Sequence, residues 1–390
     1  MQADKTLFIL TSILIGLSIL LSYSLSVYTT ILFHVGQFHF VERQILFALL
    51  SLFTIWILST LDPDKWLKPI GFSLLILSSI LMLLMPILPA SLVTEVGGAK
   101  RWIKIAGFSI APVEFFKVGF VYFLSWSFSR KMGHHGGMGI KDEFFRFLPY
   151  AVVFILSVSV IALKQKDLGQ SAVLGITLLT LLLFSGSSWR FFFSILGGVL
   201  IAFLYFILAE SHRTDRILSW WSVAQNTILG LGIFPKFIVD WLTIPVEVEP
   251  YQIGHSLNAI HNGGIFGQGV ANGTFKLGFL SEIHTDFILA GLTEEFGFIG
   301  ILFVVFIFLW MLKRIFKVAM RTKDTNVYLF SLGIGLILSF AFLINAYGIS
   351  GMTPIKGISV PFLSYGGSSM LGASFAVGMV LMVSKTVNMK

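Results

Sequence analysis

One carboxylate stands out among the side chains of this sequence that could do chemistry. Asp286 lies in the motif HTDF, between a glycine-rich stretch and a long apolar run. A carboxylate at such a boundary can act as a general base that removes a proton from a hydroxyl group. An Asp, or the neighbouring Thr285, can instead cap a helix by accepting hydrogen bonds from its first backbone N–H groups. The residues alone leave catalysis and capping equally open.

Basic side chains gather in the same kind of surroundings. They are Lys100, Arg101, Lys104, Lys117, Lys164, Lys166, Lys276 and Lys356. Arg and Lys neutralise phosphate groups, and glycine-rich turns present backbone N–H groups to anions. The alternative is that these long side chains extend from a membrane boundary to the lipid headgroups. Phosphate binding is favoured for Arg101 and Lys356, because each lies in a motif that contains Gly or Pro.

Three further acidic residues are better explained by internal contacts. Glu295 lies about two turns inside an apolar run, where a charged side chain costs roughly 2.5–3.5 kcal/mol. Glu114 and Asp167 have cationic neighbours, Lys117 and Lys166, that can neutralise them. Internal ion pairs or hydrogen bonds between helices are therefore favoured over catalysis for these three carboxylates.

The histidines do not form a metal-binding motif. His255, His261 and His284 occur in one segment, but there is no HExxH, and His255 and His261 are not four residues apart. Cysteine is absent, so neither a thiolate ligand nor a disulfide is available. No P-loop, GxSxG or Rossmann pattern occurs either, which argues against energy coupling by a bound nucleotide. We predict no dedicated metal site.

Membrane helices must position these groups. Hydrophobic residues make up 56% of the 390 positions and charged residues only 12%, unlike a soluble domain of this size. A helix needs about 20 apolar residues to cross roughly 30 Å of hydrocarbon. The sequence predicts ten such runs, near 7–28, 44–60, 69–89, 113–130, 147–163, 168–184, 191–209, 286–312, 327–349 and 362–384. The runs lack the alternating polarity of a barrel, so we predict an all-α integral membrane protein with one domain over residues 1–390.

The basic residues predict which side of the membrane each loop faces. With both termini in the cytoplasm, the inner segments hold 15 Lys and Arg, whereas the short outer loops hold 7. The densest inner cluster consists of Lys313, Arg314, Lys317, Arg321 and Lys323. We interpret this cluster as a determinant of topology, so the net charge of +8 does not indicate nucleic-acid binding.

The segment 210–285 is predicted to form a large loop on the outer, extracytoplasmic face. Within it, residues 220–242 are apolar enough to resemble a further crossing, but Pro235, Lys236 and Asp240 interrupt the run. We interpret residues 220–242 as an interfacial or re-entrant helix. A true crossing there would reverse the orientation of everything that follows.

Four segments that mix Gly or Pro with charged residues are predicted to share this outer face. They are 97–117, 163–171, 249–287 and 345–369. Irregular, polar backbone at membrane depth is tolerated where it lines a cavity and not lipid. We therefore expect the four segments to form the walls of one site.

In these segments the sequence resembles the shape, elongation, division and sporulation (SEDS) family. The resemblance rests on GGAKRWIKIAGFSIAPVEFFK (97–117), KDLGQS (166–171), GGIFGQGVANGTFKLGFLSEIHTDFI (263–288), TEEFGFIG (293–300) and GISGMTPIKGISVPFLSYGGSS (348–369). These motifs occur in family order, so the resemblance covers nearly the whole chain. It implies a peptidoglycan glycosyltransferase that polymerises lipid II, the undecaprenyl-pyrophosphate disaccharide pentapeptide, on the outer leaflet of the cytoplasmic membrane.

The resemblance also implies roles for individual residues. The family's essential acidic residue falls at Asp286, and its basic and proline positions fall at Arg101, Pro354, Lys356 and Pro361. Asp286 is therefore the predicted catalytic base. The predicted substrate-binding residues are Arg101, Glu114, Lys117, His284, Glu295, Lys356 and Ser364. Mg²⁺ or Mn²⁺ could help to hold the departing pyrophosphate, but no protein ligands for it are predicted.

The lysine in the motif PIKG favours the division branch of this family over its elongation branch. One departure from the family lies between Arg216 and Pro250, where additional residues intervene and no Asp-Pro occurs. The role of the acidic segment that the family usually carries there stays unassigned.

The implied partners are a class B penicillin-binding transpeptidase and other division proteins, in addition to membrane lipids. Nucleic acid is not expected as a partner. Two functions of other classes stay open, a lipid II flippase and a non-catalytic division scaffold. A flippase must open to both sides of the membrane, whereas the polar motifs are predicted on one side only, which favours the polymerase.

Overall fold

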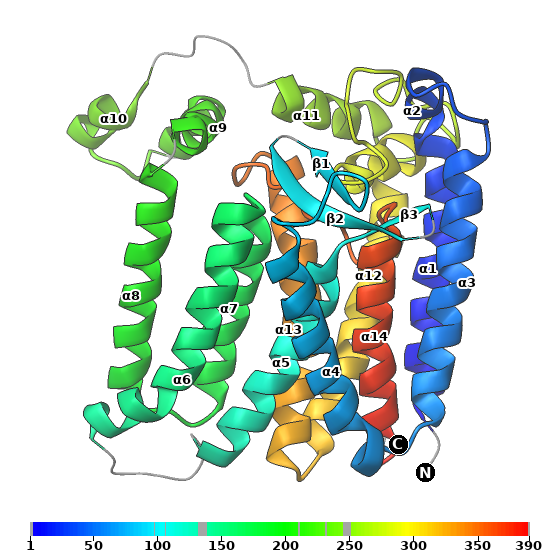
Figure 1. The fold of residues 1–390 in the computed structure, drawn as a ribbon. Helices are drawn as coiled ribbons and strands as arrows, with labels where there is room; N and C mark the ends of the chain where they lie inside the picture. Colours follow the sequence, from blue (N-terminus) through cyan, green and yellow to red (C-terminus); the bar gives the residue numbers. More distant parts are fainter. Residues whose placement is uncertain are drawn as a thin grey trace.

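Long helices run side by side between two ends of the molecule (Figure 1). The computed structural model describes residues 3–96, 98–105, 107–131, 139–209, 211–230, 232–244 and 251–388. Both chain termini lie at the lower end in Figure 1, and the strands and the helices of residues 211–263 lie at the upper end. Because both termini lie at the same end, the chain runs from one end of the molecule to the other an even number of times.

Each of the ten predicted apolar runs corresponds to a long helix, although the runs 69–89 and 362–384 each extend five residues beyond theirs. The long helices are α1 (Lys5–Leu25), α3 (His39–Thr60), α4 (Pro63–Leu84), α5 (Pro112–Lys131), α6 (Ile140–Ser159) with the π-helical turn η1 (Val160–Lys164), α7 (Leu168–Phe184), α8 (Trp189–Leu208), α12 (Ile288–Arg321), α13 (Thr325–Ile349) and α14 (Gly367–Ser384). Within the described residues, eight helices are long and apolar enough to cross a membrane. The charged α5 and the shorter α7 run alongside them (Figure 1). The chain is therefore a multi-pass membrane protein.

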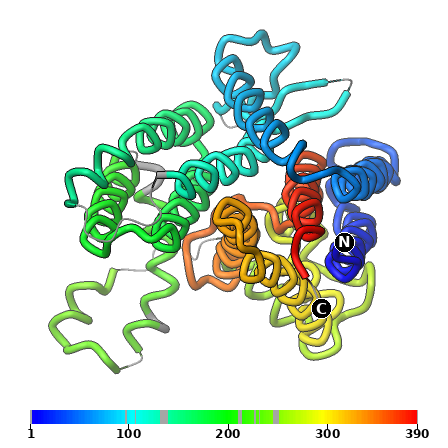
Figure 2. The backbone as a smooth tube through the Cα atoms, turned by 90° about the horizontal axis from the view of Figure 1, so that it is seen from below, coloured from blue at the N-terminus to red at the C-terminus, as the bar shows by residue number. Residues whose placement is uncertain are grey.

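Burial distinguishes central helices from peripheral ones. In α14, 72% of the apolar span is buried, whereas in α8 only 6% is buried. Figure 2 shows α14 in red among α3, α5 and α13, and α8 in green at the edge. The outward side chains of α8 are apolar, as expected for a helix that faces lipid.

Aspartates fix several helix starts at the lower end. Asp4, Asp62 and Asp324 cap α1, α4 and α13 by accepting hydrogen bonds from the first backbone N–H groups of each helix. Asp4 also accepts from Arg314 Nε at 2.7 Å, which fastens the start of α1 to α12. Local sequence therefore sets where these helices begin, and one cap doubles as an ion pair between helices.

The first polar segment folds into a small sheet that the sequence analysis did not anticipate. Strands β1 (Val93–Val96), β2 (Ala99–Ile105) and β3 (Phe108–Ile110) pair antiparallel in the order β1-β2-β3. Side chains alternate along a strand, so Arg101 shares a face of β2 with the buried Ala99 and Ile103. The sheet thus turns Arg101 toward the protein.

The large loop after α8 also contains helices. They are α9 (Ser211–Leu229), α10 (Lys236–Leu242) and α11 (Tyr251–Gly263), and a further short helix, α2 (Val27–Leu32), follows α1. Figure 1 shows α9 nearly end-on at the upper end, across the direction of the long helices, and α9 is not among the candidate spans. The single helix predicted over 220–242 is instead divided between the end of α9 and α10, and neither of these helices is a candidate span. Residues 245–250, which include Glu249 and Pro250 of the third polar segment, lie outside the described residues.

Helix α12 is interrupted near its start. Gly297 has φ 67° and ψ −167°, which breaks the helix between a short first part and a long second part, 298–321. The break frees the carbonyl groups of Glu294 and Glu295, which accept hydrogen bonds from the backbone of Gln268 and Gly269 at 2.9 Å each. The loop that carries Asp286 is thereby attached to the first part of α12.

Candidate active site

Asp286 lies in a turn directly before α12 and is half-buried. Its backbone N–H donates to Glu282 O at 3.1 Å. The N-cap residue of α12 is Phe287, and no side-chain hydrogen bond caps the helix. Within the described part of the chain, no hydrogen bond or ion pair reaches the carboxylate oxygens of Asp286. The structure therefore does not support the capping role, and it leaves the carboxylate available.

Two polar side chains hold the backbone of this turn. Asn345 in α13 donates from Nδ2 to Asp286 O at 2.6 Å and to Ile358 O at 2.7 Å. Ser364 Oγ donates to Thr285 O at 2.6 Å. The HTD motif is thus joined to the segment 345–369. Sequence reasoning assigned no role to Asn345, although an amide in an otherwise apolar span is a signal that could have pointed to it.

The PIKG motif lies directly against the carboxylate. A Cβ atom built on Gly357 would fall 2.8 Å from Asp286 Oδ2, so any larger residue at position 357 would make the carboxylate shift. Lys356 precedes Gly357 and is half-buried. The tertiary structure therefore brings the two motifs with the strongest family resemblance into contact.

Burial and neighbouring charges alter the acidity of Asp286. The pKa of Asp286 is raised to about 7, first by burial and then by the negative charges of Glu282 and Asp167, whereas Arg101 lowers it. Removal of a carboxylate from water disfavours its charged form, and nearby negative charge does the same. A base with a pKa near the operating pH is well suited to accept a proton from a hydroxyl group.

Arg101 connects the sheet to the segment 163–171. Its Nε donates to Gln165 O at 2.6 Å, and its Nη2 donates to Lys166 O at 3.1 Å. Lys166 has φ 51°, an uncommon backbone conformation that these bonds stabilise. Asp167 follows and caps α7 by accepting from Gln170 N at 3.1 Å. An arginine has five N–H donors, so Arg101 keeps donors for an anion while it holds this turn.

Glu114 and Lys117 form an ion pair at the start of α5. Lys117 Nζ lies 2.6 Å from Glu114 Oε2, and Gln170 Nε2 donates to Glu114 Oε1 at 3.0 Å. The predicted internal ion pair is confirmed for Glu114, whereas Asp167 acts as a helix cap. The pair lines a small cavity whose other lining residues are Val118, Ile337, Leu338, Ala341, Ser359, Pro361, Ser369, Gly372, Ala373 and Ala376.

A second ion pair, between Lys276 and Glu295, is buried at the break in α12. Lys276 Nζ lies 2.7 Å from Glu295 Oε1, and both side chains are at most 2% exposed. Ser24 Oγ in α1 donates to both carboxylate oxygens of Glu295, at 2.5 and 2.6 Å. Lys276 therefore serves an internal role, and this geometry favours an internal ion pair over substrate contact for Glu295. The loop, α1 and α12 meet at this pair.

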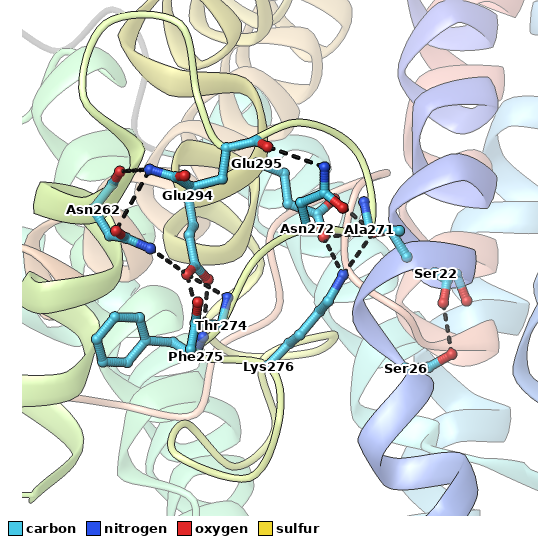
Figure 3. Close-up of polar contacts among 12 residues, drawn as sticks. Ser22, Ser26, Asn262, Ala271, Asn272, Thr274, Phe275, Lys276, Glu294 and Glu295 are labelled. Carbon is cyan, nitrogen blue, oxygen red and sulfur yellow. Dashed lines mark hydrogen bonds and ion pairs between the residues drawn. The ribbon is translucent and has the colours of Figure 1, made fainter.

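The adjacent Glu294 fastens the same loop through neutral groups. It accepts from Asn262 Nδ2 at 2.9 Å and from the backbone N–H groups of Thr274 and Phe275 at 2.7 and 3.2 Å (Figure 3). Hydrogen bonds to a charged acceptor are stronger than those between neutral groups. We call Glu294, Glu295, Lys276 and Ser24 the loop clamp, because together they fix the polypeptide that leads to Asp286.

His284 and His255 pack against aromatic rings. His284 is 3% exposed, and its ring lies 5.3 Å from Phe40 and 5.5 Å from Tyr365 between ring centroids. Burial lowers the pKa of His284, so the neutral imidazole is favoured. His255 lies 4.2 Å from Tyr251 by the same measure. Among the described residues, no group of three or more His, Cys, Asp or Glu side chains is placed to hold a metal ion.

The structure divides the predicted site residues into three groups. Asp286 and Arg101 come from different polar segments and interact electrostatically, and Lys356 precedes the glycine that lies against Asp286. Glu114 and Lys117 line the neighbouring cavity. The remaining three, His284, Ser364 and Glu295, support the backbone and the loop.

The fold and this centre define a class of protein, a multi-pass membrane protein with a polar, carboxylate-containing site at one end of its helices. Residues 4–389 match the model of the FtsW, RodA and SpoVE family, which is described as "Cell cycle protein". The chain belongs to this family, the same SEDS family that the motifs resemble.

Two relatives are similar over nearly their full length. The chain is 44% identical to the "Probable peptidoglycan glycosyltransferase FtsW" of Helicobacter pylori, with 99% of each chain covered. It is 32% identical to the protein of the same name from Trichlorobacter lovleyi, with 98% of this chain and 93% of the relative covered. The predicted preference for the division branch agrees with these names.

Solved structures share the fold. One is a chain of the structure described as "Structural coordination of polymerization and crosslinking by a peptidoglycan synthase complex", with a TM-score of 0.72, 20% identity and coverage of 100% of this chain and 99% of that chain. Another is the rod shape determining protein RodA of Thermus thermophilus, with a TM-score of 0.65, 20% identity and coverage of 100% and 98%. At this identity the likeness shows the fold alone.

Proposed function

We propose that this protein is a peptidoglycan glycosyltransferase of the FtsW type that polymerises lipid II into glycan strands for the septal cell wall. The observation that carries the proposal is the half-buried carboxylate of Asp286, with a pKa of about 7, beside Gly357 and within the field of Arg101. Relatives with this activity in their names align over nearly the whole chain. These observations support Asp286 as the base of a glycosyl transfer.

The reaction joins two lipid-linked substrates. The GlcNAc C4 hydroxyl of one lipid II attacks C1 of the MurNAc at the end of the growing chain. A new C–O bond forms at C1 with inversion, and the bond from C1 to the pyrophosphate breaks. Asp286 accepts the hydroxyl proton, a contribution of about 10² to 10⁴ in rate for a well-placed base.

Cations neutralise the departing pyrophosphate. Arg101 retains N–H donors beyond the two that hold Gln165 and Lys166, and Lys356 lies next to the glycine that contacts Asp286. Preorganised donors that meet developing charge lower the barrier of such reactions. Mg²⁺ or Mn²⁺, if bound, would supply further positive charge to the departing pyrophosphate, and Mg²⁺ commonly contacts substrate phosphates in this way.

The site faces the outer side of the cytoplasmic membrane in this proposal. The bias of basic residues supports cytoplasmic termini, and the site lies at the end of the molecule opposite the termini (Figure 1). A class B penicillin-binding transpeptidase is the proposed partner, together with other division proteins. The structural neighbour from a peptidoglycan synthase complex supports this partner, since polymerisation and crosslinking are coordinated in that complex.

Reconstitution tests the activity directly. Purified protein in vesicles is incubated with lipid II, with and without the transpeptidase partner, and glycan strands are resolved on a gel. Strands are expected from the wild-type protein. Transport of labelled lipid II between the leaflets without any glycan product would instead show that the protein is a flippase. Absence of both activities in the presence of the partner would indicate a non-catalytic scaffold.

A further inference from the structure

The end of α9 and the short helix α10 form a pair that lies outside the bundle of long helices. Trp221 Nε1 donates to Leu242 O at 2.7 Å, and Gln225 donates to Ile244 O at 2.8 Å and accepts from Ile244 N at 2.9 Å. We call residues 220–230 and 232–244 the hairpin. Figure 1 shows it at the upper end, and Figure 2 shows it extending sideways beyond the long helices.

The hairpin coincides with the departure from the family pattern. The additional residues lie between Arg216 and Pro250, and the hairpin is the part of this segment that follows the start of α9. The conserved motifs therefore do not account for it, and its surface has to be explained from its own residues.

The position of the hairpin matches the boundary of the membrane. Helix α8 has 20 residues and a largely exposed apolar surface, so it spans about 30 Å, the thickness of the hydrocarbon. It ends at Leu208, and α9 begins at Ser211 and contacts α8. The hairpin therefore lies beside the end of a lipid-facing helix, at the level of the headgroups.

Helix α10 presents two large aromatic side chains to its surroundings. Phe237 and Trp241 are four residues apart, so they share one face, and they are 73% and 81% exposed. We call these two residues the apolar stripe. Ile238 and Val239 lie on another side of the helix and are half-buried. Exposed apolar surface of this kind marks a site of interaction.

Charged side chains lie next to the stripe. Lys236 and Asp240 each precede a stripe residue by one position, about 100° around a helix of 3.6 residues per turn, and both are exposed. Apolar and charged surfaces side by side are typical of a helix in the plane of the membrane interface, where Trp is enriched. The sorting of side chains on α10 and its level beside α8 thus indicate the same partner, the lipid surface.

The hairpin is also fastened to one wall of the candidate site. Trp220 Nε1 donates to Gly351 O at 2.7 Å. Gly351 has φ 73°, a conformation that glycine adopts readily. Lys356 follows five residues later, and the next residue, Gly357, lies against Asp286. The segment 351–357 is therefore attached at one end to the hairpin and lies at the other end against the carboxylate.

We infer that the hairpin is an interfacial anchor. The apolar stripe inserts into the leaflet on the side of the candidate site, and Trp220 ties the anchored hairpin to the segment 351–357. The charges beside the stripe are of opposite sign, so the anchor recognises the interface and not a particular headgroup. Insertion of the stripe does not depend on the proposed function. If the protein polymerises lipid II, the anchor holds Lys356 at a fixed depth relative to the lipid-linked pyrophosphate.

Site-directed spin labelling of the full-length, cysteine-free chain tests the insertion. The protein is reconstituted in vesicles of phosphatidylcholine and phosphatidylglycerol, with a nitroxide at Phe237→Cys or Trp241→Cys. Collision rates are measured with oxygen, which partitions into the bilayer, and with a nickel chelate, which stays in water. Because an interfacial helix buries its apolar face about 5–10 Å deep, the ratio of oxygen to nickel collisions should be at least about threefold higher there than at Lys236→Cys and Asp240→Cys.

A second label tests the link to the site. A nitroxide at Met352→Cys, an exposed position next to Gly351, reports the mobility of the segment. Trp220→Phe removes the N–H donor and keeps an aromatic ring, so the spectrum should shift to a more mobile line shape. Trp310→Phe, a substitution in α12, serves as the control and should leave the spectrum unchanged.

Three results would overturn the inference. Nickel collisions at the stripe equal to those at Lys236→Cys and Asp240→Cys would show that the stripe lies in water. Low collision rates with both reagents at the stripe would show that it packs against protein, a second copy of the chain in these vesicles. An unchanged spectrum at Met352→Cys in the Trp220→Phe variant would refute the tie between the hairpin and the segment 351–357.

Discussion

Lys276 Nζ and Glu295 Oε1 lie 2.7 Å apart in a pair that is almost completely buried and that joins the loop before Asp286 to the broken start of α12. Ser24 of α1 completes the contact from a position 271 residues away in sequence. A buried ion pair is held firmly only when its remaining hydrogen-bonding capacity is satisfied. The loop clamp meets this condition and fixes the loop that precedes the HTD turn, whereas Asn345 and Ser364 hold the turn itself.

Breaking the buried pair on one side is expected to be more harmful than removing both charges. Lys276→Met leaves Glu295 charged and unpaired, which typically costs about 3–5 kcal/mol. The double variant Lys276→Met, Glu295→Gln should recover much of this loss. Thermal unfolding in detergent measures both, with Lys104→Met as the control because Lys104 is exposed on β2. Equal stability of the single variant and the wild type would show that the pair does not stabilise the loop.

Asp286→Asn is expected to abolish glycan polymerisation and to leave the fold intact. The amide is nearly isosteric but cannot accept the hydroxyl proton, and the hydrogen bonds to the backbone of Asp286 are unaffected. Asp286→Glu should retain at most a few per cent of activity, because a displacement of about 1 Å can cost around 10²-fold. Glycan strand synthesis, resolved on gels, and the unfolding temperature are measured for both variants and for the wild-type protein. Near wild-type synthesis by the Asn variant would exclude Asp286 as the base.

The activity should depend on pH through Asp286. With a pKa of about 7, the ionised, proton-accepting form is lost as the pH falls below about 7, so the rate should decline on the acidic side. Glu282→Gln removes a negative charge that raises this pKa, and the decline should therefore move to lower pH. Initial rates of strand synthesis are measured for the wild type and for Glu282→Gln over about three pH units around the pKa, from about pH 5.5 to about pH 8.5. If the two pH profiles superimpose, the pH dependence does not arise from Asp286.

Replacement of Lys356 is expected to affect activity alone, whereas replacement of Arg101 is expected to affect both activity and stability. Lys356→Ala should reduce the use of lipid II by tenfold or more, on the order of one charge-assisted contact, with little change in unfolding temperature. Arg101→Ala should lower both activity and stability, because two of its donors hold Gln165 and Lys166. Arg101→Lys should be milder but not silent, since the two-pronged geometry is lost.

A matched control is available on the same strand. Lys104 lies on the opposite face of β2 from Arg101, and Lys104→Ala should leave kcat/KM for lipid II nearly unchanged. Unaltered kinetics in the alanine variants of both Arg101 and Lys356 would exclude a role in substrate binding and leave Arg101 with the structural role of holding Gln165 and Lys166.

The membrane orientation can be read from single cysteines in this cysteine-free chain. Asn272 and Lys323 are both exposed and lie at the two ends of the bundle. A membrane-impermeant thiol reagent should label a cysteine at position 272 in intact spheroplasts and one at position 323 only after permeabilisation. The opposite pattern would reverse the proposed topology and place the site in the cytoplasm.

The sequence by itself determined the membrane helices and singled out Asp286 as the candidate catalytic carboxylate. An apolar run of span length has to satisfy its backbone hydrogen bonds internally, so it predicts a helix without knowledge of its neighbours. Each of the ten runs corresponds to a long helix, and the runs extend at most five residues beyond the helix ends. The motifs around Arg101, Asp286 and Lys356 were likewise recognisable, because each is a short contiguous pattern.

Only the tertiary structure decided how these motifs meet. The bonds from Asn345 to Asp286 and from Ser24 to Glu295 join residues 59 and 271 positions apart, and no local pattern encodes such a pairing. The same holds for the small sheet that turns Arg101 inward, because strand pairing depends on partners. The pKa of Asp286 is likewise a property of its burial and of charges brought from other segments. The sequence identifies the charged residues, but their pKa values and contacts depend on distances between side chains, and only the folded structure determines those distances.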